Sequence, residues 1–205
     1  MKTVCILSLF FLLLISCNKA VENKNNEIEY NHKIYKNQKF KYKEAQKLNN
    51  KGIELSIEGE DALALKTFFK ALSVEPDSPV ILSNIGNVYN HLERYKEAID
   101  YYESGLKFSD SSYLVIGTGL STAYFKVGSY QKSIDICNYI ASISEDDYML
   151  FALQVHKIYS LIELNKCEVA ISETKKLNKY SKNIDNPQEY IDFIEKLMED
   201  CKSNK

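Results

Sequence analysis

The sequence is poor in the residues that interrupt helices. It has no tryptophan, three prolines and seven glycines in 205 residues, and so few breakers argue against a turn-rich β fold. Hydrophobic residues make up 45% of the chain and charged residues 26%, which is typical of a globular protein and excludes a disordered or collagen-like chain. The composition therefore favours a helical protein with a buried core.

Arginine and net charge are also scarce. Arg94 is the single arginine among 26 basic residues, and the formal net charge is −2. A protein that binds nucleic acid by neutralising phosphates needs an excess of positive charge, and a near-neutral chain argues against that class. Recognition of phosphate or carboxylate groups by clusters of arginines is excluded too, because one arginine cannot form a cluster.

Motifs for catalysis, metal binding and nucleotide binding are missing as well. His32, His91 and His156 are isolated, since none is followed by a second ligand three or four residues later. No phosphate-binding G-x-x-x-x-G-K-[ST] occurs, and residues 117–119 (GTG) lack the third glycine of a dinucleotide-binding loop. The acidic residues 145–147 fall at an expected turn, where solvated acids are normal. We therefore predict no enzyme, metal, cofactor or small-molecule substrate.

The amino terminus has the pattern of a secretory signal. Lys2 precedes a nearly apolar run from Val4 to Ile15, and Ser16 is a small residue. A helix of that length spans roughly 18 Å, whereas a bilayer core is about 30 Å thick. We therefore predict that residues 1–16 are a signal peptide that is removed, and we exclude them from the fold.

The end of this run, residues 14–17 (LISC), resembles the lipobox of bacterial lipoproteins. The resemblance implies cleavage before Cys17, a diacylglycerol on its sulfur and an acyl chain on its amine. Two or more acyl chains hold a protein stably on a membrane. The expected location is a bacterial membrane on its extracytoplasmic side, and Asn18 favours the outer membrane and periplasm within that family. The alternative is an ordinary secreted protein with an incidental cysteine.

Residues 17–42 are predicted to be a lipidated cysteine followed by a flexible tether and lead-in. Residues 18–29 are polar and show no apolar periodicity. Residues 30–43 interleave lysines with aromatic residues, which suits either an anionic membrane surface or a solvated lead-in helix. We favour the lead-in helix, because the aromatic residues do not keep to one helical face.

From residue 45 onward the sequence repeats itself. Gly52 recurs as Gly86 and Phe68 as Tyr102, both 34 residues later, and Tyr89 recurs as Tyr124 after 35 residues. Within each unit, two apolar-periodic stretches flank a short breaker. The pattern predicts a helix, a turn and a second helix in every unit, and such units must stack to bury their apolar faces.

This pattern resembles the tetratricopeptide repeat, a unit of 34 residues with small residues where its two helices meet. Residues 43–181 would form the array, as units 45–78, 79–112, 114–147 and a degenerate 148–181. The resemblance implies an all-α solenoid of antiparallel helix pairs, about three to four units long. In the first unit the matching residues are Leu48, Gly52, Leu55, Gly59, Ala64, Phe68, Ala71 and Pro76.

In this family the first helix of each unit lines a groove that holds peptides. The family's two-carboxylate clamp is disfavoured, because Asn49, Ile53, Val115 and Gly119 stand where its other residues would be and only Asn84 matches. The groove positions carried over are Asn49, Ile53, Ser83, Asn84, Asn87, Asn90, His91, Thr118, Thr122 and Phe125. Asparagines suit an extended peptide backbone, and the alternative is that they merely solvate one helix face.

Three cysteines remain after Cys5 and Cys17 are set aside. Cys137 replaces a core aromatic and is expected to be a buried thiol. An amphipathic helix over residues 187–202, with Pro187 in its first turn, is predicted to cap the array. If a helix over about 167–180 and this cap form an antiparallel hairpin, Cys167 and Cys201 come together as a disulfide. The alternative is two independent thiols, since spacing alone does not set the distance between their Cα atoms.

The sequence thus predicts a membrane-anchored adaptor or scaffold of the bacterial cell envelope, which binds another envelope protein or peptide in its groove. A structural subunit of an envelope complex, using the convex face or the cap, is the alternative. An enzyme with an unrecognised site is a remote third.

Overall fold

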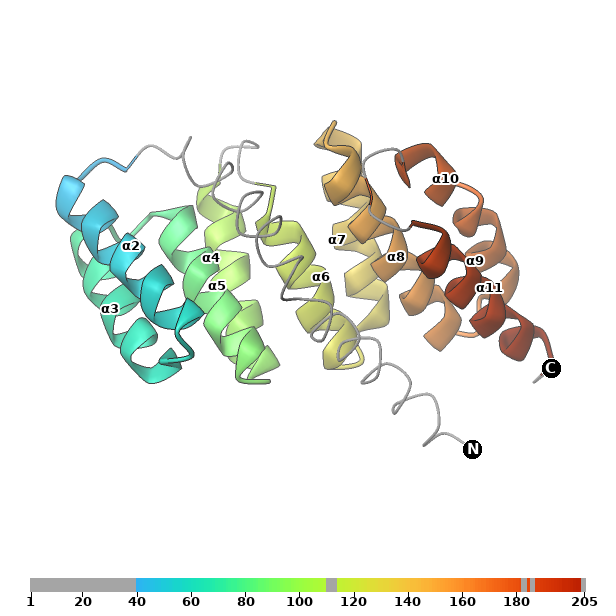
Figure 1. The fold of residues 1–205 in the computed structure, drawn as a ribbon, viewed down its shortest axis with the longest axis horizontal. Helices are drawn as coiled ribbons and strands as arrows, with labels where there is room; N and C mark the ends of the chain where they lie inside the picture. Colours follow the sequence, from blue (N-terminus) through green and yellow to red (C-terminus); the bar gives the residue numbers. More distant parts are fainter. Residues whose placement is uncertain (1–39, 110–113, 182–183, 185–186, 204–205) are drawn as a thin grey trace. The chain divides into compact units, whose positions relative to one another are not determined.

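The computed structural model describes residues 40–109, 114–181, 184 and 187–203. The predicted signal peptide 1–16, Cys17 with its lipid, and nearly all of the tether 17–42 lie outside these residues. Within the described part, every regular element is a helix (Figure 1). The helices are α2 (Lys43–Ile57), α3 (Asp61–Val74), α4 (Pro79–His91), α5 (Tyr95–Phe108), α6 (Ile116–Lys126), α7 (Tyr130–Ile143), α8 (Asp147–Glu163), α9 (Cys167–Thr174), α10 (Leu177–Tyr180) and α11 (Pro187–Ser203).

Consecutive helices pair as the repeat pattern predicts, and the same kind of turn connects the two helices of each pair. One residue of every turn has a positive φ, and the residue after it donates a backbone hydrogen bond to a carbonyl five positions earlier, which is the Schellman geometry of a helix end. The residues with positive φ are Gly59 (82°), Glu93 (58°), Gly128 (76°) and Asn165 (55°). The fourth turn comes two residues later than a 35-residue step predicts, because α8 is longer than the equivalent helices before it.

Glycine and aromatic residues meet at the contact between the two helices of a pair. A Cβ atom on Gly52 would lie 2.6 Å from the ring of Phe68, and one on Gly86 would lie 2.7 Å from the ring of Tyr102. The Tyr102 ring also touches Gly119 of the next pair, where a Cβ atom would lie 2.6 Å away. Since these distances are too short for any side chain, glycine lets the helices approach closely and leaves space for a buried ring.

A polar seam joins α6, α7 and α8. Ser121 lies 2.8 Å from Nδ1 of His156, Ser133 donates to the carbonyl of Ser121 at 2.9 Å, and Ser160 donates to the hydroxyl of Ser133 at 3.1 Å. All three serines are fully buried. Burial lowers the pKa of His156 to about 4, so its imidazole is neutral at neutral pH.

The last pair is covered by α11. Ile191, Ile194 and Met198 are buried in a core that includes Ile158 and Leu177. The prediction of one continuous helix over 167–180 is wrong, since α9 ends at Thr174 and α10 begins at Leu177. The hydroxyl of Thr174 donates to the carbonyl of Ala170 at 3.0 Å, a local bond of the kind that bends helices.

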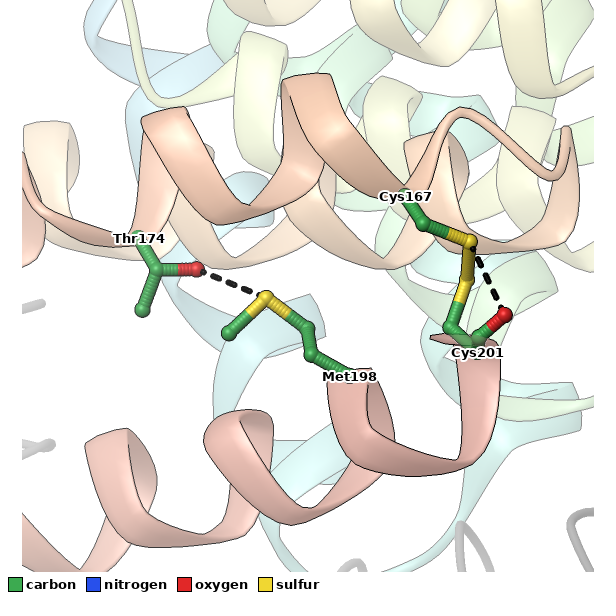
Figure 2. Close-up of a disulfide and its surroundings, with 4 residues drawn as sticks. All are labelled: Cys167, Thr174, Met198 and Cys201. Atoms are coloured by element: carbon green, nitrogen blue, oxygen red, sulfur yellow. Dashed lines mark hydrogen bonds between the residues drawn. A yellow bond between two sulfur atoms is a disulfide. The ribbon is translucent and has the colours of Figure 1, made fainter. Parts of the chain in front are cut away.

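Cys167, at the start of α9, and Cys201, near the end of α11, form a disulfide, with their Cα atoms 6.0 Å apart (Figure 2). The Sγ atom of Cys167 also lies 3.3 Å from the carbonyl oxygen of Cys201, but a disulfide sulfur has no hydrogen to donate. Nearby, the Thr174 hydroxyl points at the sulfur of Met198, 3.4 Å away. The disulfide therefore fastens the covering helix to the last repeat.

None of the described helices is long and apolar enough to cross a membrane.

Replacing both Cys167 and Cys201 with serine should lower the free energy of unfolding by about 3–4 kcal/mol, because the disulfide closes a loop of 34 residues in the unfolded chain. Urea denaturation followed by circular dichroism measures the loss. Cys137→Ser serves as a comparison that leaves the disulfide intact. Peptide mapping without reductant should recover the two cysteines in one linked species, and finding both alkylated would contradict the pairing.

The neutral state of His156 should make stability depend on pH. Its pKa is about 4 in the folded protein and about 6.5 in an unfolded chain, so between pH 6.5 and pH 4 mainly the unfolded state takes up the proton. Stability is thus lost as the pH falls from 6.5 towards 4. From pH 7 to pH 5 the free energy of unfolding should drop by about 1–2 kcal/mol more in the wild type than in His156→Gln. If the free energy of unfolding changed with pH in the same way in the wild type and in His156→Gln, this prediction would be contradicted.

Candidate functional site

The first helices of the pairs form one continuous surface. Helices α2, α4, α6 and α8 each contact the next in that series. Equivalent positions on them carry Ile53, Asn87, Thr122 and Lys157, spaced by one repeat. We call this surface the first-helix face. Asn87 is exposed on it, and the other three side chains are half-buried.

Asn87 is held in place by the core beneath it. The hydroxyl of Tyr102 donates to Oδ1 of Asn87 at 2.7 Å, and Tyr102 itself is fully buried between Gly86 and Gly119. Within the described part of the chain, the amide nitrogen of Asn87 makes no hydrogen bond, so both of its hydrogens can reach a ligand. The first pair has Phe68 in place of Tyr102, and there the equivalent surface residue is the apolar Ile53.

Three of the predicted groove residues do not lie on an open surface, and the prediction needs correcting for them. Asn49 and Asn84 are 2% and 3% exposed, and Asn84 donates to Oδ1 of Asn49 at 2.8 Å. Ser83 is also buried, and its hydroxyl has no partner among the described residues. Two asparagines that bond to each other across α2 and α4 join the first two pairs and do not present their amides to a peptide.

Asn90 and His91, at the end of α4, have different surroundings. Asn90 is half-buried, and its Oδ1 atom is buried without a hydrogen-bond partner in the described part of the structure. His91 is exposed, and its Nδ1 atom lies 2.9 Å from Oδ2 of Asp61, at the start of α3. His91 therefore already has a partner in the first pair.

The predicted residues on α6 are half-buried. Thr118 donates to the carbonyl of Val115 and Thr122 to the carbonyl of Thr118, both at 2.9 Å, so both hydroxyl hydrogens are used within the helix. The ring of Phe125 packs against Tyr130 and Tyr159, with centroids 5.4 and 6.4 Å away. Phe125 thus combines a structural contact with a partly exposed aromatic surface.

Lys157 is the member of the first-helix face that the sequence interpretation missed. The sequence alone, read as a fourth unit that starts at residue 148, places His156 and Tyr159 in the groove instead, because the match to the repeat is weak there. Ser121 aligns with Gly86, and its contact with His156, 35 residues later, places His156 at the same repeat position. Lys157 therefore aligns with Thr122. The Ser121–His156 contact does not make a catalytic pair, since Ser121 is fully buried.

No cluster of three or more possible metal ligands occurs in the part of the chain that the structure describes. The acidic turn at residues 145–147 has a structural use. The carboxylate of Asp146 accepts a hydrogen bond from the backbone of Met149 at 2.8 Å and caps the start of α8.

The tetratricopeptide repeat family profile matches residues 79–111, which cover α4 and α5. Human tetratricopeptide repeat protein 6 is 27% identical over 83 residues, which are 40% of this chain and 16% of that protein. The chain thus covers a small part of this relative's length.

Solved structures with the same fold share little sequence with this chain. A tetratricopeptide repeat protein from Parabacteroides merdae has a TM-score of 0.64 and 16% identity over 80% of this chain and 62% of its own. YrrB, described as a tetratricopeptide repeat protein with an unusual peptide-binding site, has a TM-score of 0.57 and 20% identity over 75% of this chain and 86% of its own. At these identities the likeness concerns the fold. Residues 79–111 are thus recognised as a tetratricopeptide repeat, within an all-α solenoid of helix pairs like those of solved tetratricopeptide repeat proteins.

Proposed function

We propose that this chain is a protein-binding adaptor, which holds an extended peptide segment on the first-helix face. The observation that carries the proposal is Asn87, an exposed residue whose amide oxygen accepts a hydrogen bond from the buried Tyr102. Ile53, Thr122 and Phe125 add partly exposed surface on the neighbouring helices. A polar donor between apolar and aromatic contacts suits a peptide backbone with alternating side chains. The similar protein YrrB, which has an unusual peptide-binding site, supports a peptide as the ligand class.

We further propose that the adaptor works in the bacterial cell envelope, anchored to a membrane by acyl chains on Cys17. The support is the pattern of residues 1–17, namely a basic start, a short apolar run and the residues LISC. The disulfide between Cys167 and Cys201 fits this location, since disulfides persist in oxidising compartments outside the cytoplasm. The partner would be another envelope protein, held near the membrane surface.

Asn87→Asp should weaken partner binding at least about fivefold, because it keeps the oxygen that accepts from Tyr102 but loses the donor hydrogens and adds a charge that repels peptide carbonyls. Crosslinking in intact cells followed by mass spectrometry identifies the partner, and a titration with the purified partner measures affinity. Asn178→Asp, the same change at an exposed position of α10, is the matched control. Equal affinities of the two variants would move the binding site off the first-helix face.

Bacteria that express the full chain should incorporate an alkynyl palmitate label into it, and Cys17→Ala should abolish the label, because the thiol is the attachment point of the anchor. Fractionation should then find the variant released from membranes. Cys137→Ala is the control, since that thiol is buried and should not affect labelling. A label that survives in Cys17→Ala would rule out the anchor.

A further inference from the structure

One repeat position changes its residue type where the array reaches its third pair. Phe68 in α3 and Tyr102 in α5 are buried rings, and Cys137 in α7 occupies the equivalent place. The ring of Tyr102 fills the space against Gly119 of the following first helix. One repeat later, Gln154 occupies the position of Gly119, and Cys137 has no ring to fill the space against it.

A pocket of about 270 Å³ opens at this place, and we call it the Cys137 pocket. It lies between α7, α8, α9 and α10. Cys137 and Leu153 form its buried floor, and Ala141, Asn138 and Ser142 are exposed residues on its wall. The pocket is small, open to solvent on one side and more polar than apolar in its lining, so it suits a small polar group.

The charged residues of this pocket are not balanced. Among the described residues that line it, the charged ones are Lys157, Glu173 and Lys176. Both ammonium groups bind the same oxygen of Glu173, at 3.2 Å from Lys157 and 2.9 Å from Lys176. The second carboxylate oxygen accepts from Gln154 at 2.7 Å. One carboxylate thus serves two ammonium groups, and the wall carries one uncompensated positive charge.

The three charged side chains differ in exposure. Those of Lys157 and Glu173 are 17% and 10% exposed, whereas that of Lys176 is 54% exposed and can be reached by a ligand from the solvent. Burial alone would raise the pKa of Glu173, but hydrogen bonds from Lys176 and Gln154 and the ammonium of Lys157 outweigh it and lower the pKa. The carboxylate is therefore ionised, and the surplus charge belongs to the lysines. Because Lys157 and Lys176 share one carboxylate oxygen, an added anion would give the surplus ammonium a charged hydrogen-bond acceptor of its own.

We propose that the Cys137 pocket binds a carboxylate group, whose two oxygens contact Lys157 and Lys176 while a short apolar chain lies on Leu153, Ala141 and Cys137. A single negative charge matches the single surplus positive charge. Burial raises the pKa of the Cys137 thiol to about 12, so this residue contributes surface and no nucleophile at neutral pH. The carboxylate belongs either to a free short-chain acid or to an acidic side chain of a bound peptide.

Isothermal titration calorimetry of the full chain with butyrate, and with the uncharged butyramide, tests the proposal. Butyrate should bind, and Lys157→Gln and Lys176→Gln should each weaken binding about tenfold, since each removes a charged hydrogen-bond donor. Lys175→Gln makes the same change on the neighbouring exposed residue, which does not line the pocket, and should leave binding unchanged. Equal binding of butyramide, or equal effects of all three variants, would overturn the proposal.

A terminally blocked pentapeptide with a central glutamate, and its glutamine counterpart, separate the two sources of the carboxylate. Binding of butyrate supports a free acid, whereas binding of only the glutamate peptide supports a peptide side chain. The proposal fails if neither ligand binds. Cys137→Phe restores the ring of the earlier pairs and should abolish binding by filling the pocket. If that variant does not fold, the lysine variants still decide the question. The free acid makes this test independent of the proposed protein partner.

Discussion

The contact of a buried aromatic ring with a glycine backbone is the constraint on which this array depends. Phe68 against Gly52, and Tyr102 against both Gly86 and Gly119, set how closely the helices approach. A methyl group at any of these glycines would overlap the ring, and the ring cannot move away because it is enclosed on the other side. This packing therefore controls both the spacing within a pair and the spacing between pairs.

The same repeat position also determines the chemistry of the surface above it. In the first pair this position is Phe68, and the first-helix face there carries the apolar Ile53. In the second pair it is Tyr102, whose hydroxyl donates a hydrogen bond to Asn87 on that face. A cysteine, as at position 137, leaves unfilled volume and exposes the cationic wall of a pocket. The residue at this one core position thus differs from pair to pair, and the surroundings on the first-helix face differ with it.

The end of the array requires a separate solution, because the last pair has no following repeat to cover it. Helix α11 buries Ile191, Ile194 and Met198 against α8 and α9, and the disulfide between Cys167 and Cys201 fastens it there. The short helix α10, which interrupts the expected continuous helix, places Tyr180 and the end of α9 beside the Cys137 pocket. The covering of the last repeat and the lining of that pocket therefore involve the same few segments.

The sequence by itself determined the helices, the turns and the repeat step, because these depend on local periodicity and on single residues such as Gly59 and Gly128 whose positive φ ends a helix. It also indicated Cys137 as a buried thiol and Asn87 as a surface residue. Only the tertiary structure decided that Asn49 and Asn84 bond to each other, that Lys157 aligns with Asn87, and that Cys137 leaves a cavity. The physical reason is that these features depend on the contact of residues about 35 positions apart. A shift of one or two residues in register, as in α8, changes which side chains meet, and the local pattern does not specify such a shift.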